Sequence, residues 1–185
     1  MKVILISGKA GHGKDTLAGS MKLCLNKQGK RVLITHYGDL VKYICRNFFD
    51  WDGKKDEQGR HLLQFVGTDV VRAQRPNYWV DFLRDVLSLF DGEWDYVLIP
   101  DVRFPNEIEG MDCFQTRHIR IIRPGYSQLT EEQQRHLSET ALDNYPKKPW
   151  ITVINDGTLT QLYEKAAEIC AELIDDQGAE TDLFH

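Results

Sequence analysis

The sequence lacks the cysteine pairs that build a zinc site or a disulfide framework. Its four cysteines are Cys24, Cys45, Cys113 and Cys170, and none stands at C-x-x-C spacing from another. Structural zinc sites and small disulfide-linked domains both depend on such closely spaced sets. We therefore expect reduced thiols, most of them buried as small apolar side chains.

Long hydrophobic runs are also missing. The apolar run at the N-terminus, residues 3–6, stops before Gly8. A membrane-spanning helix needs about 20 apolar residues, and the hydrophobic region of a signal peptide needs roughly 7 to 15. The sequence therefore predicts a cytoplasmic protein that does not interact with a membrane.

Positive charge is not in excess. The chain has 23 Lys and Arg residues against 28 Asp and Glu residues, a net charge of −5. Proteins that bind DNA or RNA polymers need surplus positive charge to neutralise the phosphates, although a local basic pocket can still bind a small anion. We exclude a nucleic acid polymer as partner and expect small-molecule substrates. The oligomeric state stays open, with a homodimer as one option.

What the sequence does have is an alternation of apolar strands with amphipathic helices. Its 185 residues suit one domain with inserted lobes, and 42% of them are hydrophobic. Alternation of this kind is typical of a parallel sheet covered by helices on both faces. It predicts a three-layer α/β/α fold around a five-stranded parallel sheet. The expected strands are Lys2–Ser7, 31–36, 95–100, 117–123 and 151–155.

Two segments fall outside this alternation. Residues 37–90 are mostly helical by pattern, apart from a polar stretch at 49–59 that reads as a surface loop, and they form an inserted lobe. Residues 127–145 are strongly polar and suit an exposed, mobile cover. We expect a single domain over 1–185 whose core is 1–36, 91–123 and 150–175, with a lobe at about 37–90 and a lid at about 124–146.

The most informative motif follows the first strand. Gly8-Lys9-Ala10-Gly11-His12-Gly13-Lys14 has the spacing G-x-x-x-x-G-K and leads into a helix. Glycines let the backbone wrap a phosphate, successive N–H groups form an anion-binding nest, and the lysine reaches the terminal phosphates. The loop therefore predicts ATP as a ligand. The alternative is a glycine-rich turn without a ligand. The expected ATP-binding residues are Gly8, Ala10, Gly11, His12, Gly13, Lys14, Asp15 and Thr16.

One residue departs from the motif. Asp15 occupies the position after the lysine, where a Ser or Thr hydroxyl usually binds Mg²⁺, and Thr16 comes second. A carboxylate is a good oxygen ligand for Mg²⁺, but it can also cap a helix N-terminus. Both roles for Asp15 stay open, and Thr16 becomes the expected phosphate contact.

Charged residues follow the other expected strands. Ligands bind beyond the carboxyl ends of parallel strands, so Asp39, Asp101, Arg103 and Arg123 stand where a site would form. Asp101 is placed to hold the metal or its waters, the alternatives being a turn or an ion pair. Arg103 suits bidentate binding of an acceptor phosphate.

Further groups could complete the site. Arg72, Gln64 and Trp79 supply an anion donor, an amide and a flat surface for a base, although an arginine is most often a surface charge and a tryptophan most often core. Arg123 and Arg135, together with His136 in the lid, could neutralise charge on the transferred group. The expected catalytic residues are Lys14, Asp15, Asp101, Arg103 and Arg123, with Asp15 and Asp101 as metal ligands.

Taken together, these residues resemble the bacteriophage-type deoxynucleoside monophosphate kinases, a P-loop family related to adenylate kinase. The resemblance runs from the first strand to the last helix. It is carried by Gly8-x-x-x-x-Gly13-Lys14-Asp15-Thr16, Leu63-Gln64, Gly67-Thr68-Asp69, Arg72, Trp79, Asp101-Val102-Arg103-Phe104-Pro105-Asn106-Glu107, His136-x-Ser138-Glu139 and Ile154-Asn155.

The resemblance implies an adenylate-kinase-like core with an acceptor-binding lobe, a mobile lid, and Mg²⁺-ATP as phosphoryl donor. It implies that Asp15 is a variant shared by the family, and that Asn155 lies near the adenine of ATP. The acceptor residues that it implies are Gln64, Arg72, Trp79 and Arg103. We add four residues to the acceptor side because of their positions in the sequence: Asp39, Lys42, Arg135 and His136.

The sequence therefore predicts a kinase that transfers phosphate from Mg²⁺-ATP to a deoxynucleoside monophosphate. One alternative is a P-loop kinase for another small acceptor, such as dephospho-coenzyme A, phosphomevalonate or gluconate. The other is a module that binds ATP without turnover, because one P-loop fold hosts many functions.

Overall fold

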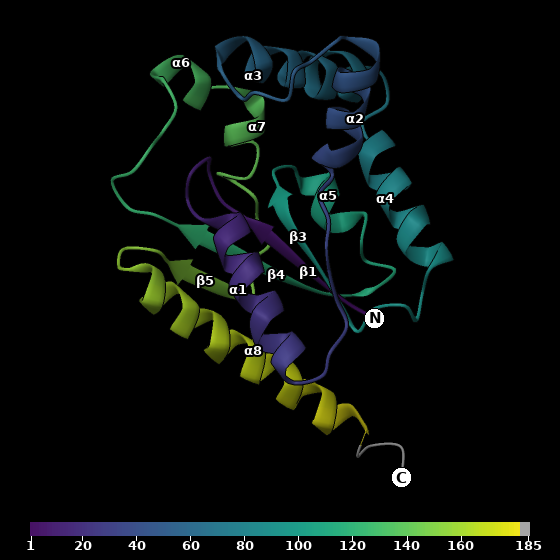
Figure 1. The fold of residues 1–185 in the computed structure, drawn as a ribbon, viewed down its shortest axis with the longest axis vertical. Coiled ribbons are helices and arrows are strands. Elements are labelled where there is room, and N and C mark those ends of the chain that lie inside the picture. The colour runs from purple at the N-terminus through teal and green to yellow at the C-terminus, as the bar shows by residue number, and fades with distance from the viewer. Residues whose placement is uncertain (182–185) are drawn as a thin grey trace.

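A computed structural model of the chain describes residues 1–181, with side chains up to residue 175 (Figure 1). The prediction of one domain over 1–185 includes four further residues, 182–185, which lie outside the described residues. At the centre is a five-stranded sheet with the order β2-β3-β1-β4-β5, in which every neighbouring pair is parallel. The strands are β1 (Lys2–Ser7), β2 (Val32–Ile34), β3 (Tyr96–Val102), β4 (Gln115–Ile122) and β5 (Ile151–Ile154).

The helices lie between these strands, as the alternation predicts. They are α1 (Lys14–Lys27), α2 (Gly38–Phe48), α3 (Glu57–Gln64), the π-helix η1 (Phe65–Arg72), α4 (Tyr78–Leu89), α5 (Pro105–Glu109), α6 (Glu131–Gln134), α7 (Leu137–Thr140) and α8 (Leu159–Thr181). Among residues 1–181 there is no helix with the length and apolar character to cross a membrane.

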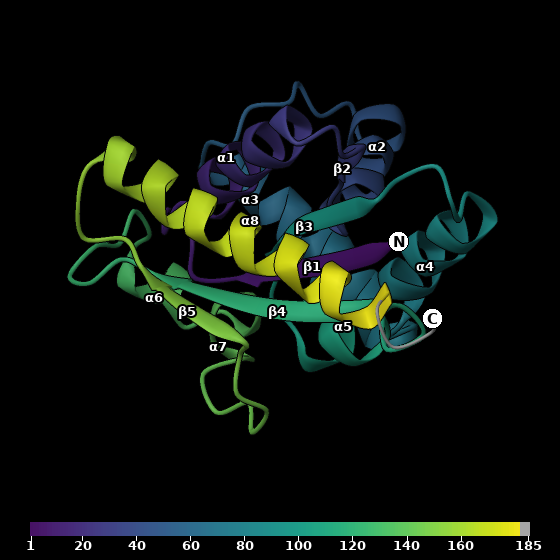
Figure 2. The same cartoon turned by 90° about the horizontal axis from the view of Figure 1, so that it is seen from below.

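The central strand β1 explains why the fold has three layers. Successive side chains of a strand point to opposite faces, so Ile4 and Ile6 pack with α1 and α8, whereas Val3 and Leu5 pack with α2, α4 and α5. All four of these side chains are fully buried. Figure 2 shows α1 and α8 together over the sheet, and the predicted α/β/α arrangement is confirmed.

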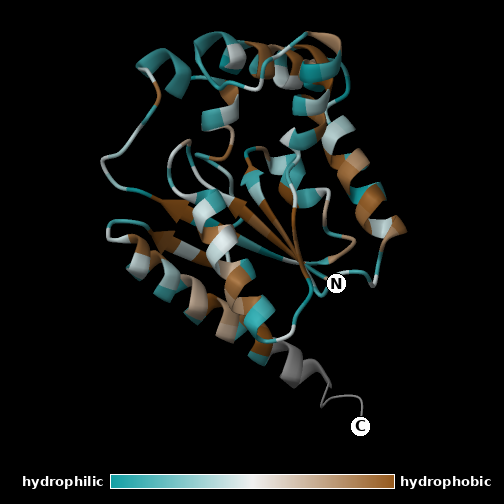
Figure 3. Cartoon of the chain, viewed as in Figure 1, coloured by the Kyte–Doolittle hydropathy of each residue, from teal (hydrophilic) through white to brown (hydrophobic). Residues whose placement is uncertain are grey.

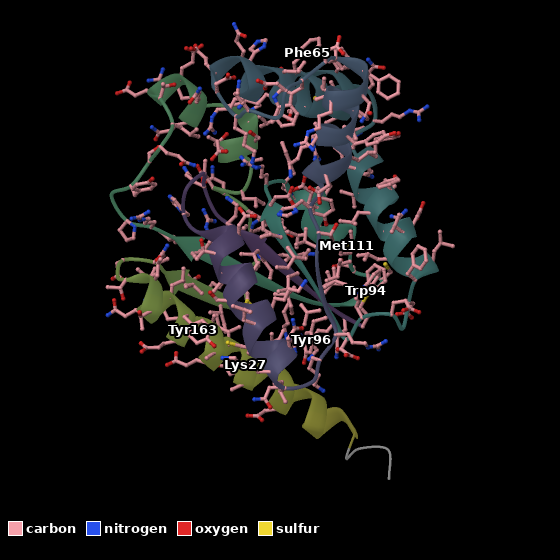
Figure 4. All side chains as sticks on the ribbon, viewed as in Figure 1. Lys27, Phe65, Trp94, Tyr96, Met111 and Tyr163 are labelled. Atoms are coloured by element: carbon pink, nitrogen blue, oxygen red, sulfur yellow. The ribbon has the colours of Figure 1, made fainter. Side chains whose placement is uncertain are left out.

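Polar contacts join the two helices of the α1 layer. Figure 4 shows Lys27 of α1 next to Tyr163 of α8, where the lysine Nζ donates to the tyrosine hydroxyl at 3.1 Å. Tyr96 of β3 is fully buried and donates its hydroxyl to the carbonyl of Leu173 of α8 at 3.2 Å. The C-terminal helix is therefore fixed to both α1 and the sheet.

The inserted lobe begins with more helix than the sequence pattern predicts. Residues 49–59 were expected to form a surface loop, but α3 begins at Glu57, and Gly59 is buried. The Asp56 carboxylate caps this helix by accepting the Gly59 N–H at 2.9 Å. A side-chain oxygen at an N-cap satisfies an otherwise unpaired backbone donor, so Asp56 marks a helix start inside the segment that was expected to be a loop.

The lid is the second part of the chain where the structure differs from the prediction. Its first part is hydrophilic, as Figure 3 shows for α6, and fits the prediction of an exposed cover. Its second part does not, because Glu139 and Leu142 are buried and Leu142 belongs to the core beneath. The Asp143 carboxylate pairs with Lys9 at 3.1 Å and with Arg120 at 3.5 Å. Residues 137–145 are therefore anchored to the core through these contacts, contrary to the expectation of an exposed cover over the whole segment, while the mobility of the lid stays a prediction.

Candidate active site

The glycine-rich loop lies between β1 and α1, as its motif predicts. Gly8 and Gly13 have φ angles of 154° and 98°, which residues with a side chain rarely adopt. A Cβ atom on Gly8 would lie 2.5 Å from the carbonyl oxygen of Ile121, and one on Gly13 would lie 2.7 Å from Asn155 Nδ2. The loop thus presses against the ends of β4 and β5, and only glycine fits these positions.

Lys14 begins α1 and folds back over the loop. Its Nζ donates to the carbonyl oxygens of Gly8 at 2.7 Å and Lys9 at 3.0 Å. Burial lowers the pKa of this lysine to about 8, and the nearby Arg103 guanidinium contributes. An ammonium group held against loop carbonyls is already placed where phosphate oxygens would meet it.

Two other predicted ATP residues support the loop from behind. His12 is buried, with Nδ1 3.4 Å from the Ile121 carbonyl oxygen, and burial lowers the pKa of its imidazole. Asn155 donates from Nδ2 to the His12 carbonyl at 3.0 Å. Asn155 therefore fixes the loop to the end of β5, and its expected place near the adenine stays a prediction.

Asp15 starts a chain of four charged groups that the sequence only partly predicted. His36 Nε2 lies 2.9 Å from Asp15 Oδ1, and His36 Nδ1 lies 3.2 Å from Asp39 Oδ2. Asp39 in turn accepts a hydrogen bond from Lys42 at 2.8 Å. Bonding to both carboxylates raises the pKa of His36 to about 9, so it is a cation at neutral pH. His36 was missed, although it stands just beyond the second strand, where the strand-end rule could have found it.

Asp101 lies at the end of β3 and contacts the start of α2. Its two carboxylate oxygens accept the backbone N–H groups of Tyr37 at 3.0 Å and Gly38 at 2.9 Å. A carboxylate at a helix N-terminus is favoured by the helix dipole and by the free N–H groups there. Asp101 thus has a structural contact that the sequence did not indicate, while its role toward a metal stays a prediction.

The opposite wall of the site is built around Arg72. Its Nη2 donates to Glu107 Oε1 at 2.5 Å, its Nη1 donates to Asn106 Oδ1 at 3.1 Å, and its guanidinium lies 3.9 Å from the Phe104 ring centroid. Glu107 is buried and also accepts the backbone N–H groups of Arg103 and Phe104 at 2.6 and 3.0 Å. Burial raises the pKa of this carboxyl to about 7, against the opposing effect of Arg72.

Arg103 connects this wall with the loop. Its Nη1 donates to the Ser138 carbonyl at 3.2 Å and to the Glu139 carboxylate. Glu139 also accepts the Ala10 N–H of the glycine-rich loop at 3.0 Å. Sequence reasoning placed Glu139 in the lid and gave it no role.

Between the two walls lies a cavity of about 330 Å³, large enough for small ligands. Its lining includes predicted residues from the loop, the strand ends and the lobe. These are Ala10, Gly11, Lys14, Asp15, Lys42, Gln64, Arg72, Trp79, Asp101 and Arg103. Lys55 and Arg60 also line it, and sequence reasoning gave them no role; Lys55 lies in the segment 49–59 that was expected to be a surface loop, and Arg60 follows that segment directly.

Trp79 is more buried than was expected for a residue that stacks on a base. It is 2% exposed, and its Nε1 donates to the Gly67 carbonyl at 2.8 Å. Its other neighbour is Tyr78, whose ring meets it edge to face with centroids 5.0 Å apart. The ring therefore forms part of both the lobe core and the cavity wall, and contact with an acceptor base stays a prediction.

Nine predicted residues are absent from the described lining of the cavity: Gly8, His12, Gly13 and Asn155, whose contacts are given above, and Thr16, Asp39, Arg123, Arg135 and His136. Arg123 stacks on Tyr126 with 4.0 Å between guanidinium and ring centroid, and Arg135 is exposed and lies 3.7 Å from Glu131. His136 caps α7 through Ser138, with Nε2 3.7 Å from Asp69 of the lobe. Asp39 contacts the site through His36 and Lys42, both of which line the cavity. Thr16 is exposed on the first turn of α1.

Comparison with known proteins decides the family. Residues 39–166 match the model of the deoxynucleotide monophosphate kinase family. The chain belongs to this family. It is 30% identical over 169 residues to the uncharacterized protein ORF77 of Ictalurid herpesvirus 1 (strain Auburn), a match that covers 89% of this chain and 68% of that protein. It is also 31% identical over 108 residues to the deoxynucleotide monophosphate kinase of Enterobacteria phage T4, which covers 57% of this chain and 42% of that enzyme.

Solved structures share the fold of this family member at low identity. The Mycobacterium tuberculosis APS kinase CysC, solved in complex with AMPPNP and APS, gives a TM-score of 0.51 at 15% identity and covers 94% of this chain and 95% of that one. The dephospho-CoA kinase from Campylobacter jejuni gives 0.50 at 14% identity, covering 92% and 95%. These neighbours confirm the predicted P-loop kinase fold. At such identity they carry no information on the acceptor of a deoxynucleotide monophosphate kinase.

Proposed function

We propose that the chain transfers the terminal phosphoryl group of ATP to the phosphate of a deoxynucleoside monophosphate, giving a deoxynucleoside diphosphate and ADP. The observation that supports this most is the two-sided cavity. One wall is the glycine-rich loop with Lys14, and the other holds Arg72 and Arg103 on buried carboxylates. A protein that only bound ATP would need the first wall and not the second.

In the proposed reaction the loop binds the donor. Its N–H groups and Lys14 would contact the β- and γ-phosphates, and the positive end of α1 adds to their attraction. When phosphate oxygens replace the carbonyls of Gly8 and Lys9 as partners of Lys14, the ammonium form is favoured. The lysine would then follow the charge that develops as the phosphoryl group leaves ADP.

The second wall would bind the acceptor. Arg103 presents a guanidinium to the cavity between the loop and the lobe, and Arg72 lies behind it on Glu107. A planar guanidinium can bind two phosphate oxygens at once. The acceptor phosphate has a second pKa of about 6, so it is already ionised near neutral pH and needs no general base. Positioning and charge neutralisation carry the reaction.

Magnesium fits this site as part of the donor complex. Among the described residues no group of three or more His, Cys, Asp or Glu side chains could hold a metal unaided. Mg²⁺ is usually held by one or two carboxylates together with substrate phosphates and water. Asp15, whose side chain is 79% exposed beside Lys14, is the candidate ligand, with Asp101 behind it. The ion would neutralise phosphate charge when bound.

The lid would exclude water from the closed complex. Gln128, Leu129 and Gln133 line the cavity from the hydrophilic part of the lid, and Tyr126 lies against Gly11 of the loop. Excluding water strengthens the electrostatic contacts and suppresses hydrolysis of ATP. We also place the reaction in the cytoplasm, where ATP is abundant; the free cysteines of the described residues suit that setting.

A substrate panel tests the proposal. The purified chain is incubated with ATP and Mg²⁺ and with each common deoxynucleoside and ribonucleoside monophosphate, and ADP formation is measured. We expect turnover with one or more deoxynucleoside monophosphates and none without an acceptor. Dephospho-coenzyme A, phosphomevalonate and gluconate are included, because turnover only with one of these would overturn the proposal. ATP binding without any acceptor-dependent turnover would favour a module that does not catalyse transfer.

A further inference from the structure

Glu139 is a buried carboxylate that lies between the glycine-rich loop and Arg103. Its side chain is 4% exposed, and it comes from the anchored part of the lid. One oxygen accepts the Ala10 N–H of the glycine-rich loop at 3.0 Å, and the other contacts Arg103 Nη1. Burying a carboxylate is costly unless charged and hydrogen-bonding partners compensate. Glu139 has both kinds of partner.

The contact also determines how Arg103 can be used. Only Nη1 of its guanidinium bonds to Ser138 and Glu139, while Arg103 itself lines the cavity. Among the hydrogen bonds of the described side chains, none involves Nε or Nη2 of Arg103. One edge of the guanidinium is therefore held by the lid, and the other is free to bind a phosphate in the cavity.

We infer that Glu139 is a positioning residue for phosphoryl transfer, an inference that rests on the proposed function. It holds Arg103 with the free edge of its guanidinium toward the acceptor phosphate, and it ties this orientation to the loop through the Ala10 N–H. Because the same carboxylate makes both contacts, closing of the lid onto the loop and alignment of the Arg103 guanidinium occur together. Loss of the carboxylate would leave a long side chain with several rotamers, and misalignment of such a group can cost up to about 100-fold in rate.

The matched control is Asp143, four residues along the same lid segment. It pairs with Lys9 and Arg120 and so anchors the lid to the loop, but among the described residues it makes no hydrogen bond or ion pair with Arg103. If Glu139 served only to anchor the lid, Asp143→Asn would change the kinetics as Glu139→Gln does. Gln keeps the size of the side chain and one hydrogen-bond acceptor, so folding should survive; Glu139→Asp is a second variant that keeps the charge.

The experiment is a kinetic double-mutant cycle on Arg103→Ala and Glu139→Gln. We expect Glu139→Gln to lower kcat/KM for the monophosphate at least about tenfold while KM for ATP changes less than about twofold, and Glu139→Asp to recover part of the loss. On the Arg103→Ala background, Glu139→Gln should have little further effect, since residues in direct contact are non-additive. Asp143→Asn should keep wild-type kcat/KM. Additive losses, or equal losses in Asp143→Asn and Glu139→Gln, would overturn the inference.

Failure of the proposed function would be visible separately, because the wild-type chain would then phosphorylate no monophosphate. In that case the same cycle is measured on the affinity for inorganic pyrophosphate, which can contact the loop and Arg103 without any acceptor base. A loss of affinity in Glu139→Gln that disappears on the Arg103→Ala background supports the positioning role. An additive loss, or none, contradicts it.

Discussion

Glu107 accepts a hydrogen bond from Arg72 at 2.5 Å, and this pair joins the lobe to α5, which follows the end of β3, on the acceptor side of the cavity. The two side chains are 3% and 11% exposed, so the pair is largely shielded from water. The second Glu107 oxygen accepts two backbone N–H groups, from Arg103 and Phe104. One carboxylate therefore orients Arg72 and shapes the turn that carries Arg103.

Replacing this carboxylate should affect both stability and acceptor binding. In Glu107→Gln the amide NH₂ group faces hydrogen-bond donors, either Arg72 or the backbone N–H groups of Arg103 and Phe104. Arg72 also loses the negative charge that balances its own. Removing one partner of a buried ion pair costs about 3 to 5 kcal/mol, and we expect a free energy of unfolding lower by about 3 kcal/mol. Urea denaturation measures this loss, and KM for the monophosphate should rise at least tenfold while KM for ATP stays nearly constant.

A matched control lies on the same short helix. Glu109 also belongs to α5, but it is exposed, and among the described residues its carboxylate accepts a hydrogen bond only from the Tyr145 hydroxyl, at 3.3 Å. Glu109→Gln should change the free energy of unfolding by less than about 1 kcal/mol, as is usual for surface contacts. Similar losses in the two variants would mean that the Arg72 pair is not what makes Glu107 important.

Lys14 should be essential for turnover and dispensable for folding. It is the buried cation of the loop, and its Nζ meets only loop carbonyls in the described structure. Lys14→Ala removes the charge that would follow the transferred phosphoryl group, so we expect kcat to fall by at least about 1,000-fold. Lys27→Ala, at the other end of the same helix, should keep wild-type turnover. Circular dichroism checks that both variants fold, and full activity of Lys14→Ala would refute the site.

The sequence was sufficient to predict the sheet and the loop because both depend on local signals. The strand Lys2–Ser7 contains the unbroken apolar run of residues 3–6, so the strand and its burial follow directly. The motif beginning at Gly8 needs only a strand before it and a helix after it. Arg103, expected from the strand-end rule, and Arg72, expected from the family motif, both line the cavity, and their roles toward an acceptor stay predictions.

The buried carboxylates could not be predicted in this way. Glu107 and Glu139 are glutamates, a residue type that usually lies on the surface. Their partners, Arg72 and Arg103, lie 35 and 36 residues away in the chain. Such pairs exist only after the lobe and the lid have packed on the sheet. The same holds for Asp101, whose contact with Tyr37 and Gly38 depends on where α2 begins rather than on any local pattern.

The first loop glycine should not tolerate a side chain. Gly8 has a φ of 154°, and a Cβ atom there would lie 2.5 Å from a backbone oxygen, which cannot move aside as a flexible side chain would. Gly8→Ala should therefore displace the loop, with affinity for ATP at least tenfold weaker by calorimetry.

Gly19 provides the comparison for that variant. It lies within α1, and a Cβ atom there would meet nothing within 4 Å. Alanine in a helix interior is favoured over glycine by about 0.5 to 1 kcal/mol, so Gly19→Ala should raise the unfolding midpoint and leave ATP affinity unchanged. Equal ATP affinities in Gly8→Ala and the wild type would contradict the close packing of the loop.

His118 should make the protein less stable in acid. It lies on β4 beneath the loop, with Nε2 2.8 Å from the Ser7 hydroxyl oxygen, and burial together with Arg120 lowers the pKa of its imidazole to about 4. In the unfolded chain a histidine takes up its proton near pH 6.5. Between about pH 6.5 and 4 the unfolded state therefore binds more protons, and the free energy of unfolding falls as the pH falls.

His118→Gln isolates this contribution because glutamine does not titrate. Carboxylates with lowered pKa, such as Asp39 and Asp95, destabilise both proteins in acid and cancel in the comparison. Urea denaturation of the wild type and the variant at pH 7, 6, 5 and 4.5 should give a difference that shifts by about 2 kcal/mol in favour of the variant as the pH falls. Ser7→Ala, which removes the hydrogen bond but keeps the imidazole, should retain the wild-type pH dependence. Parallel curves for the wild type and His118→Gln would show that His118 titrates normally in the folded protein.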